Sequence, residues 1–179
     1  MSRALVLLAD GFEEIEAVTI IDVLRRGEVA VTTASLSGKH VKGSHEMVLE
    51  ADALLSDVSV DDFHALILPG GPAAKTLRED ARAQAAIKRA AEAGKLVAAV
   101  CAGPTALEAA GVLRGKRATA YPGNQLPSAS FVEENVVEDG KIITSRGPGT
   151  TMAFALKLVE RLASAEVAKT TAERLIFQG

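Results

Sequence analysis

The sequence is poor in cysteine, histidine and aromatic residues. It has one cysteine, no tryptophan and three histidines among 179 residues, and aromatic residues make up 3% of the chain. A single cysteine cannot close an intramolecular disulfide, and the histidines show no recognisable metal-ligand spacing with it. We therefore expect a reducing compartment, no bound metal, and a core built mainly from alanine, valine, leucine and isoleucine.

Long apolar runs and blocks of like charge are also missing. The apolar stretch before Asp10 is too short for the core of a signal peptide or for a membrane span. The 20 basic and 23 acidic residues leave a net charge of −3, without the basic stripe of a nucleic-acid-binding protein. These features predict a cytoplasmic protein that binds neither membranes nor nucleic acids.

Short apolar runs alternate with helical patterns along the chain. ALVLLA (4–9), a helical pattern over 13–26 and VAVTTAS (29–35) form a βαβ unit, and 37–52 reads as an excursion beside the main sheet. ALIL and KLVAAV are continuously apolar, as in parallel strands buried on both faces, and a helix is predicted over 81–92. We predict one domain over 1–179, an α/β flavodoxin-like three-layer sandwich with a mostly parallel central sheet. No GxGxxG follows the first strand, which disfavours a dinucleotide fold.

Ligands of open α/β sheets gather at the carboxyl ends of the strands. Four junctions fall there in this sequence: DGFEEIE (10–16), PGG (69–71), CAGPT (101–105) and SRGPGT (145–150). Cys101 lies where a buried strand turns into a helix, like the nucleophile of a strand-turn-helix elbow, and the helix N-terminus would favour its thiolate. The alternative is a buried, inert cysteine, which is the common role of an isolated one.

The acids and glycines at these junctions each have two possible roles, one structural and one catalytic. Glu13, Glu14 and Glu16 complement the helix dipole, and one of them could turn inward toward Cys101, although the residues do not say which. The N–H groups of Gly71 and Ala102 could form an oxyanion pocket, or the glycines could simply make tight turns. The phosphate-loop motif GxxxxGK[ST] is absent.

No histidine lies at these junctions, which disfavours a Cys–His peptidase. Tyr121 falls at the next strand end, where it would line the pocket.

The stretches LLADGFEEIEAV, IDVLRRG, LPGG, AAVCAGPTALEAAG and ITSRGPGT together resemble the ThiJ/PfpI superfamily, in its Parkinson disease deglycase branch. The resemblance covers nearly the whole chain. It implies a flavodoxin-like homodimer with a reactive cysteine and no cofactor. The resemblance assigns Cys101 as the nucleophile, Glu16 as the inward carboxylate, and the N–H groups of Gly71 and Ala102 as oxyanion donors. It also implies that Gly70 and Pro148 lie at the pocket. Arg26 and His45 are the basic residues that it implies near the pocket mouth.

The chain departs from that pattern at Tyr121, where human-type members have a histidine. Proton transfer would then rest on Glu16 alone. The tail RLIFQG resembles the apolar C-terminus of the family. Phe-Gln-Gly also matches the remnant of a cleaved tag, but Leu175 and Ile176 favour the native interpretation.

Two hypotheses follow for the function. The first is a cofactor-independent glyoxalase that converts methylglyoxal to lactate, or a deglycase that acts on glycated proteins or nucleotides, through a Cys101 nucleophile. The second is an oxidative-stress sensor or redox-regulated chaperone in which Cys101 forms a sulfinate. A thiazole-biosynthesis enzyme rests on family naming alone.

Overall fold

A seven-stranded sheet forms the centre of the computed structural model, which describes residues 1–178. Gly179, the last residue of the predicted apolar tail, lies outside the described residues. The strands of the sheet are β1 (Arg3–Leu8), β2 (Ala30–Ser35), β5 (Ala53–Leu54), β6 (Ala65–Leu68), β7 (Leu96–Val100), β10 (Val136–Asp139) and β11 (Ile142–Ser145). Their order is β10-β11-β7-β6-β1-β2-β5, and only β10 runs antiparallel to its neighbour.

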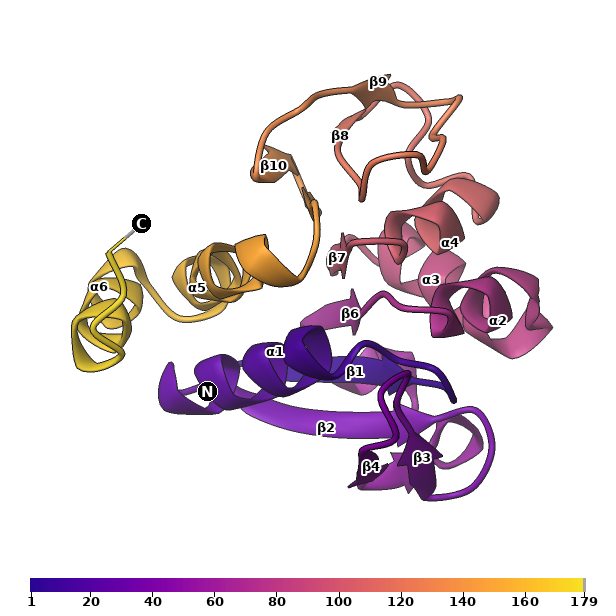
Figure 1. Cartoon of the computed structure of the whole chain (residues 1–179), viewed down its shortest axis with the longest axis horizontal. Coiled ribbons are helices and arrows are strands. Elements are labelled where there is room, and N and C mark those ends of the chain that lie inside the picture. The colour runs from indigo at the N-terminus through magenta and orange to yellow at the C-terminus, as the bar shows by residue number, and fades with distance from the viewer. Residues whose placement is uncertain (179) are drawn as a thin grey trace.

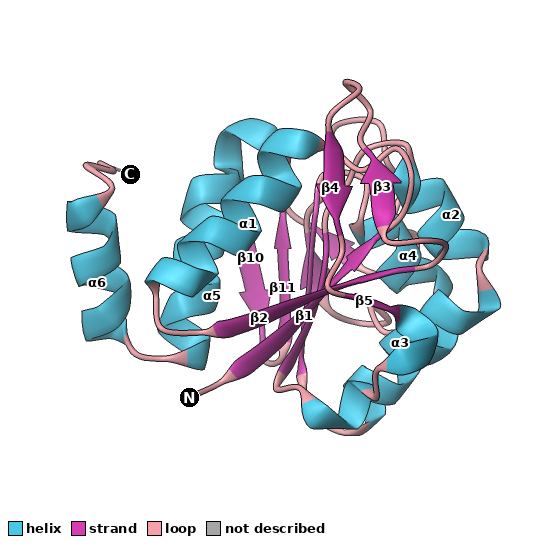
Figure 2. Cartoon of the chain, turned by 90° about the horizontal axis from the view of Figure 1, so that it is seen from below, coloured by secondary structure: helices cyan, strands magenta, loops and turns pink. Residues whose placement is uncertain are grey.

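Helices cover both faces of this sheet (Figures 1 and 2). One face carries α1 (Glu14–Arg26) and α5 (Thr151–Leu162), with α6 (Ala165–Arg174) packed outside α5. The other face carries α2 (Ala73–Glu79), α3 (Ala81–Glu92) and α4 (Pro104–Ala109). Short 3-10 turns are η1 (Leu55–Asp57), η2 (Val60–Asp62) and η3 (Pro148–Thr150). The predicted flavodoxin-like α/β sandwich is therefore confirmed.

The central strands are fully buried because apolar side chains point to both faces. Every residue of β6 and β7 is buried, as the continuous apolar runs predict for parallel strands between helix layers. The helices α1 and α5, which share one face of the sheet, also approach each other closely. A Cβ at Gly27, after α1, would lie 2.5 Å from both methyl carbons of Val159 on α5. This close approach therefore depends on the absence of a side chain at Gly27.

The excursion over 37–52 forms a separate hairpin of β3 (His40–Lys42) and β4 (Val48–Glu50). A second small pair, β8 (Arg117–Ala118) with β9 (Ser130–Phe131), flanks the long loop after α4. The sequence analysis does not predict β5, β9 or helix α2, all of which are short. None of the helices within residues 1–178 is long and apolar enough to cross a membrane.

Candidate active site

Cys101 occupies the turn between β7 and α4, at the carboxyl edge of the sheet. Its backbone is left-handed, with φ at 63°, which is rare for a residue other than glycine. Two hydrogen bonds hold it there: its N–H donates to the Ser145 carbonyl at 3.0 Å, and its carbonyl accepts from the Tyr121 N–H at 2.9 Å. Backbone strain that is fixed from both sides is typical of functional positions.

Glu16 is the acid that turns inward. It comes from the first turn of α1 and is completely buried, and its Oε2 accepts a hydrogen bond from the Gly70 N–H at 2.7 Å. Its Oε1 is buried without a hydrogen-bond partner among residues 1–178. Glu13 caps the helix by accepting from the Glu16 N–H at 2.8 Å. Among the three carboxylates that the residues left open, Glu16 is the one whose side chain lies beside Gly70, next to Cys101.

Gly70 brings the acid and the cysteine together. A Cβ at this position would lie 2.6 Å from Cys101 Cβ, 2.8 Å from Glu16 Oε2 and 2.9 Å from the Ala102 nitrogen. Gly71 has a positive φ of 81°, and a Cβ there would lie 2.5 Å from the Gly11 carbonyl. These glycines are thus required by close approach as well as by turn geometry.

The acid and the thiol titrate as a coupled pair. Burial raises the pKa of Glu16 to about 7, although hydrogen bonds from Gly70 and Cys101 lower it. Burial, followed by the charge of Glu16 and a hydrogen bond to it, raises the pKa of Cys101 to about 12, against hydrogen bonds from the N–H groups of Gly71 and Ala102. The N–H groups of Gly71 and Ala102 lower the thiol pKa, in the direction that the sequence predicts, whereas desolvation and the charge of Glu16 act against them.

Some of the other predicted site residues lie at the Cys101 edge of the sheet, and others do not. Gly71 and Ala102 both direct an N–H at the sulfur. Tyr121 is half exposed, and a Cβ on Gly147 would lie 3.2 Å from its ring, so the ring stands against the chain just before Pro148. Pro148 begins η3 at the same edge of the sheet.

His45 and Arg26 do not join Cys101. The His45 Nδ1 lies 2.9 Å from Glu14 Oε2, so that this side chain fastens the hairpin to α1. Arg26 pairs with Asp22 in the last turn of α1, ten residues beyond Glu16, which is about 15 Å along a helix. The prediction of Arg26 at the pocket is not met within this chain, because α1 carries it to the opposite edge of the sheet.

Glu14 is a second buried acid, and it was one of the three carboxylates that the sequence left as candidates to turn inward. Burial raises its pKa, but hydrogen bonds from His45 and Ser44 outweigh burial and lower it to about 2. Ligand atoms of Glu13, Glu14 and His45 lie within 4.8 Å of one another. Glu14 and His45 already satisfy each other, so the cluster is accounted for without a metal. A Cβ at Gly43 would overlap the Glu14 carboxylate, which is a requirement that the sequence gives no signal for.

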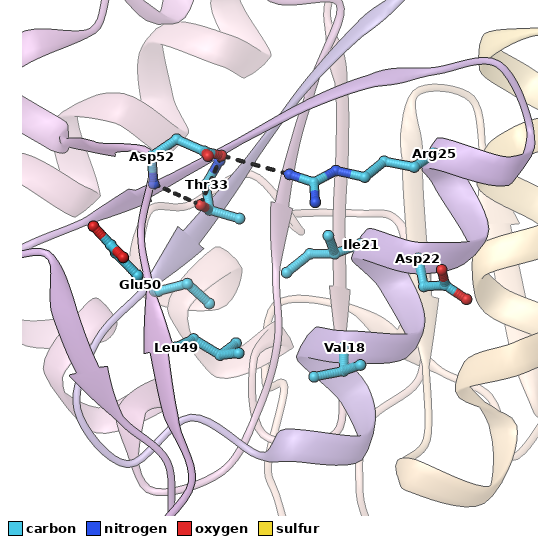
Figure 3. Close-up of a pocket in the computed structure, with 9 residues that line it drawn as sticks. Val18, Ile21, Asp22, Arg25, Thr33, Leu49, Glu50 and Asp52 are labelled. Atoms are coloured by element: carbon cyan, nitrogen blue, oxygen red, sulfur yellow. Dashed lines mark hydrogen bonds and ion pairs between the residues drawn. The ribbon is translucent and has the colours of Figure 1, made fainter.

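A hollow of about 280 Å³ lies away from Cys101, between α1, β2 and the hairpin. Figure 3 shows Val18 and Ile21 of α1 facing Leu49, with Asp52 bonded to Thr33 and paired with Arg25 at 3.7 Å. Beside it, the large apolar side chains Ile15, Val18, Met47 and Val48 are 45–61% exposed. This apolar face is the surface of α1 and the hairpin.

A cysteine on a strained strand-to-helix turn, with a buried glutamate beside it, defines a class of α/β sandwich proteins. The chain belongs to the DJ-1/PfpI family, whose model matches residues 2–161. It is 41% identical to the Parkinson disease protein 7 homologue of Danio rerio over 184 residues, covering 98% of this chain and 97% of that protein.

Two other comparisons bear on fold and activity. The crystal structure of Drosophila melanogaster DJ-1beta superposes with a TM-score of 0.96 at 40% identity, over the whole of both chains. A protein of Pyrococcus abyssi named deglycase is 37% identical over 164 residues, covering 89% of this chain and 99% of its own.

Proposed function

We propose that the protein is a cofactor-independent enzyme that removes reactive dicarbonyls such as methylglyoxal, or their early adducts on proteins and nucleotides, through Cys101. The observation that carries the proposal is the pairing of a buried thiol with a buried acid whose pKa is about 7. An acid with that pKa can take and return a proton at neutral pH. The name of the Pyrococcus abyssi relative supports the deglycase form of the activity.

The first step is attack of the Cys101 sulfur on the aldehyde carbon. A carbon–sulfur bond forms, the thiol proton passes to ionised Glu16, and Glu16 returns this proton to the aldehyde oxygen, which becomes the hydroxyl of a hemithioacetal. Glu16 is then ionised again for the next step. The N–H groups of Gly71 and Ala102, which lower the thiol pKa, are the donors proposed for the oxygen that develops beside the sulfur.

The following steps move one proton between neighbouring carbons. Ionised Glu16 removes the hydrogen from the former aldehyde carbon, giving an enediol-like species, and a proton returns to the adjacent carbon. The product is a thioester of lactate, in which the first carbon is oxidised and the second is reduced. Water then cleaves the thioester, releasing lactate and the Cys101 thiol. The sum is methylglyoxal plus water to lactate, with no external oxidant or reductant.

The test is glutathione-free conversion of methylglyoxal to lactate by the native chain, Cys101→Ser and Glu16→Gln. We expect each variant to lose most turnover, at least about 100-fold, as general acid–base and nucleophilic roles imply. In the native chain kcat/KM should rise with pH through about 7, following ionisation of Glu16. Full activity of a folded Glu16→Gln variant would remove Glu16 from the mechanism.

A redox role is the second candidate, favoured by the unpartnered Oε1 of Glu16. A protonated Glu16 could donate a hydrogen bond to an oxygen added to the Cys101 sulfur, which would stabilise a sulfinate. Mild peroxide should then add two oxygen atoms to the native chain and none to Cys101→Ser, by intact mass. Dicarbonyl turnover by the protein before oxidation distinguishes the enzyme hypothesis from the sensor hypothesis.

The apolar face fits a second copy of this chain, which makes the working form a homodimer. Ile15 and Val18 on α1 and Met47 and Val48 on the hairpin present one surface, because Glu14 and His45 join the two elements. Val18→Glu should shift the mass measured by light scattering to that of a monomer. Ile176→Glu, at an exposed position in the tail, is the matched control.

A further inference from the structure

Basic residues line up across the amino edge of the sheet, opposite Cys101. Arg3 opens β1, His64 precedes β6, Lys95 precedes β7 and Lys141 precedes β11, and these four strands are neighbours in the sheet. The N-terminus marked in Figure 2 lies at this edge. The row is independent of the chemistry proposed for Cys101.

Backbone hydrogen bonds fix this row in register. The His64 N–H donates to the Arg3 carbonyl at 2.8 Å, and the Leu96 N–H donates to the His64 carbonyl at 3.0 Å. The Val97 N–H donates to the Lys141 carbonyl at 2.9 Å. Parallel pairing therefore holds the basic residues at the starts of adjacent strands, where their positive charges contribute to one local electrostatic potential.

The row borders a hollow of about 270 Å³. Its lining consists of Ser2, Phe63, His64, Gly94, Lys95, Leu96, Lys141, Arg161 and Leu162. Four of these nine residues are basic types and none carries a carboxylate. Two acids contact the lining from outside: Glu138 pairs with Arg161, and the Asp61 carbonyl accepts from Lys95 Nζ. In a chain of net charge −3, this is a local concentration of positive charge.

Lys95 and Arg161 already bind other groups of the protein, whereas Lys141 and His64 keep hydrogen-bond donors for a ligand. Lys95 Nζ donates to the carbonyls of Asp61 and Phe63, and Arg161 is paired with Glu138. Lys141 is exposed and lines the hollow, and no ion pair or hydrogen bond of its Nζ is found within residues 1–178. His64 Nδ1 accepts the Arg3 N–H at 3.1 Å, so a neutral His64 ring carries its hydrogen on Nε2 as a donor.

We propose that this hollow binds the phosphate group of a small phosphate monoester, with Lys141 and His64 as its principal donors. A phosphate offers several acceptor oxygens and a double negative charge, which suits converging cationic donors better than a single carboxylate does. The volume of about 270 Å³ lies just below the usual range for small-molecule sites, which favours a small ester. Phe63, Leu96 and Leu162 supply apolar wall for the carbon part of the ester.

A purely structural role for these cations makes a different prediction. Helices α3 and α5 end at this edge, and cations near helix C-termini are stabilising without any ligand. In that case Lys141→Gln would lower stability and leave phosphate binding unchanged. Phosphate affinity is therefore the decisive readout.

The experiment is NMR titration of the isotope-labelled full chain with glycerol 3-phosphate and with inorganic phosphate, at constant ionic strength. We expect saturable shifts at residues 64, 95–96 and 141, with the ester bound more tightly than inorganic phosphate. Lys141→Gln and His64→Gln should each weaken ester binding by about tenfold, as loss of a charge-assisted hydrogen bond implies. Lys39→Gln, an exposed lysine on the distant hairpin, is the charge-matched control and should leave affinity unchanged.

Three results would overturn the proposal. They are shifts that do not saturate, an equal loss of affinity in Lys39→Gln, and inorganic phosphate binding as tightly as the ester. Repeating the titration with Cys101→Ser keeps the question separate from catalysis, because the site should bind equally well in that variant. Dicarbonyl turnover can thus succeed or fail without affecting the outcome here.

Discussion

Cys101 and Glu16 meet across the bare α-carbon of Gly70, where a single added methyl group would touch both. Such a Cβ would lie 2.6 Å from Cys101 Cβ and 2.8 Å from Glu16 Oε2, and Cβ atoms in proteins do not make nonbonded contacts shorter than 3.0 Å. The pairing of thiol and acid therefore depends on a residue that takes no part in the chemistry.

Gly70→Ala should separate the pair and reduce kcat/KM for methylglyoxal at least about tenfold, because angstrom-scale misplacement of reacting groups is costly. Gly149→Ala is the control, since a Cβ there meets nothing within 4 Å. Circular dichroism and thermal unfolding establish that both variants fold. Equal activity of the two variants would show that the spacing across Gly70 does not matter.

Glu16→Gln should lower the pKa of the Cys101 thiol, because it removes a buried negative charge that disfavours the thiolate. Titration of thiolate absorbance near 240 nm measures this directly, since the chain has one cysteine. Its one tyrosine is removed from the signal by working in Tyr121→Phe. A thiol pKa that stays the same or rises would contradict the coupling described for the site.

Gly27→Ala should destabilise the fold, by about 1–3 kcal/mol, because the new methyl group overlaps Val159. Val159→Ala makes room for it, at its own cost of a lost contact. In the double variant the loss in free energy of unfolding should be smaller than the sum of the single losses. Urea unfolding of the four proteins completes the cycle, and strict additivity would argue against the contact.

His45→Ala should reduce stability more at pH 6 than at pH 9. A hydrogen bond to Glu14, followed by its charge, raises the pKa of His45 in the folded state. A raised folded pKa gives stability that is complete below the unfolded value of about 6.5 and is lost as pH rises through the folded value. Urea unfolding of both proteins at the two pH values measures the difference; a loss that does not depend on pH would mean that His45 acts only by packing.

The sequence was sufficient for the central strands β6 and β7, because every position in these short runs is apolar, as strands buried on both faces require. The helix over 81–92 was predicted with its observed bounds, since Asp80 is a strong N-cap and accepts from the N–H groups of Arg82 and Ala83. The two-residue strands were beyond prediction. Their pairing is made by tertiary contacts, with too few residues for any periodicity.

The candidate site was predicted less evenly. Position at a strand end located Cys101, but which of three neighbouring glutamates turns inward depends on where α1 packs, and the residues alone left it open. The helix N-terminus, which lowers the thiol pKa, is visible in a sequence, whereas the desolvation that raises this pKa depends on the folded structure. Arg26 was placed by resemblance, without regard to the length of α1.

The two edge strands of the main sheet differ in length, and neither is suited to pairing with a further strand. β5 has two residues, and β10 has four, of which Glu138 and Asp139 are charged. Unpaired strand borders are templates for aggregation, and short or charged ones are poor templates. Neither border of the main sheet therefore offers another polypeptide a long, uncharged strand to pair with.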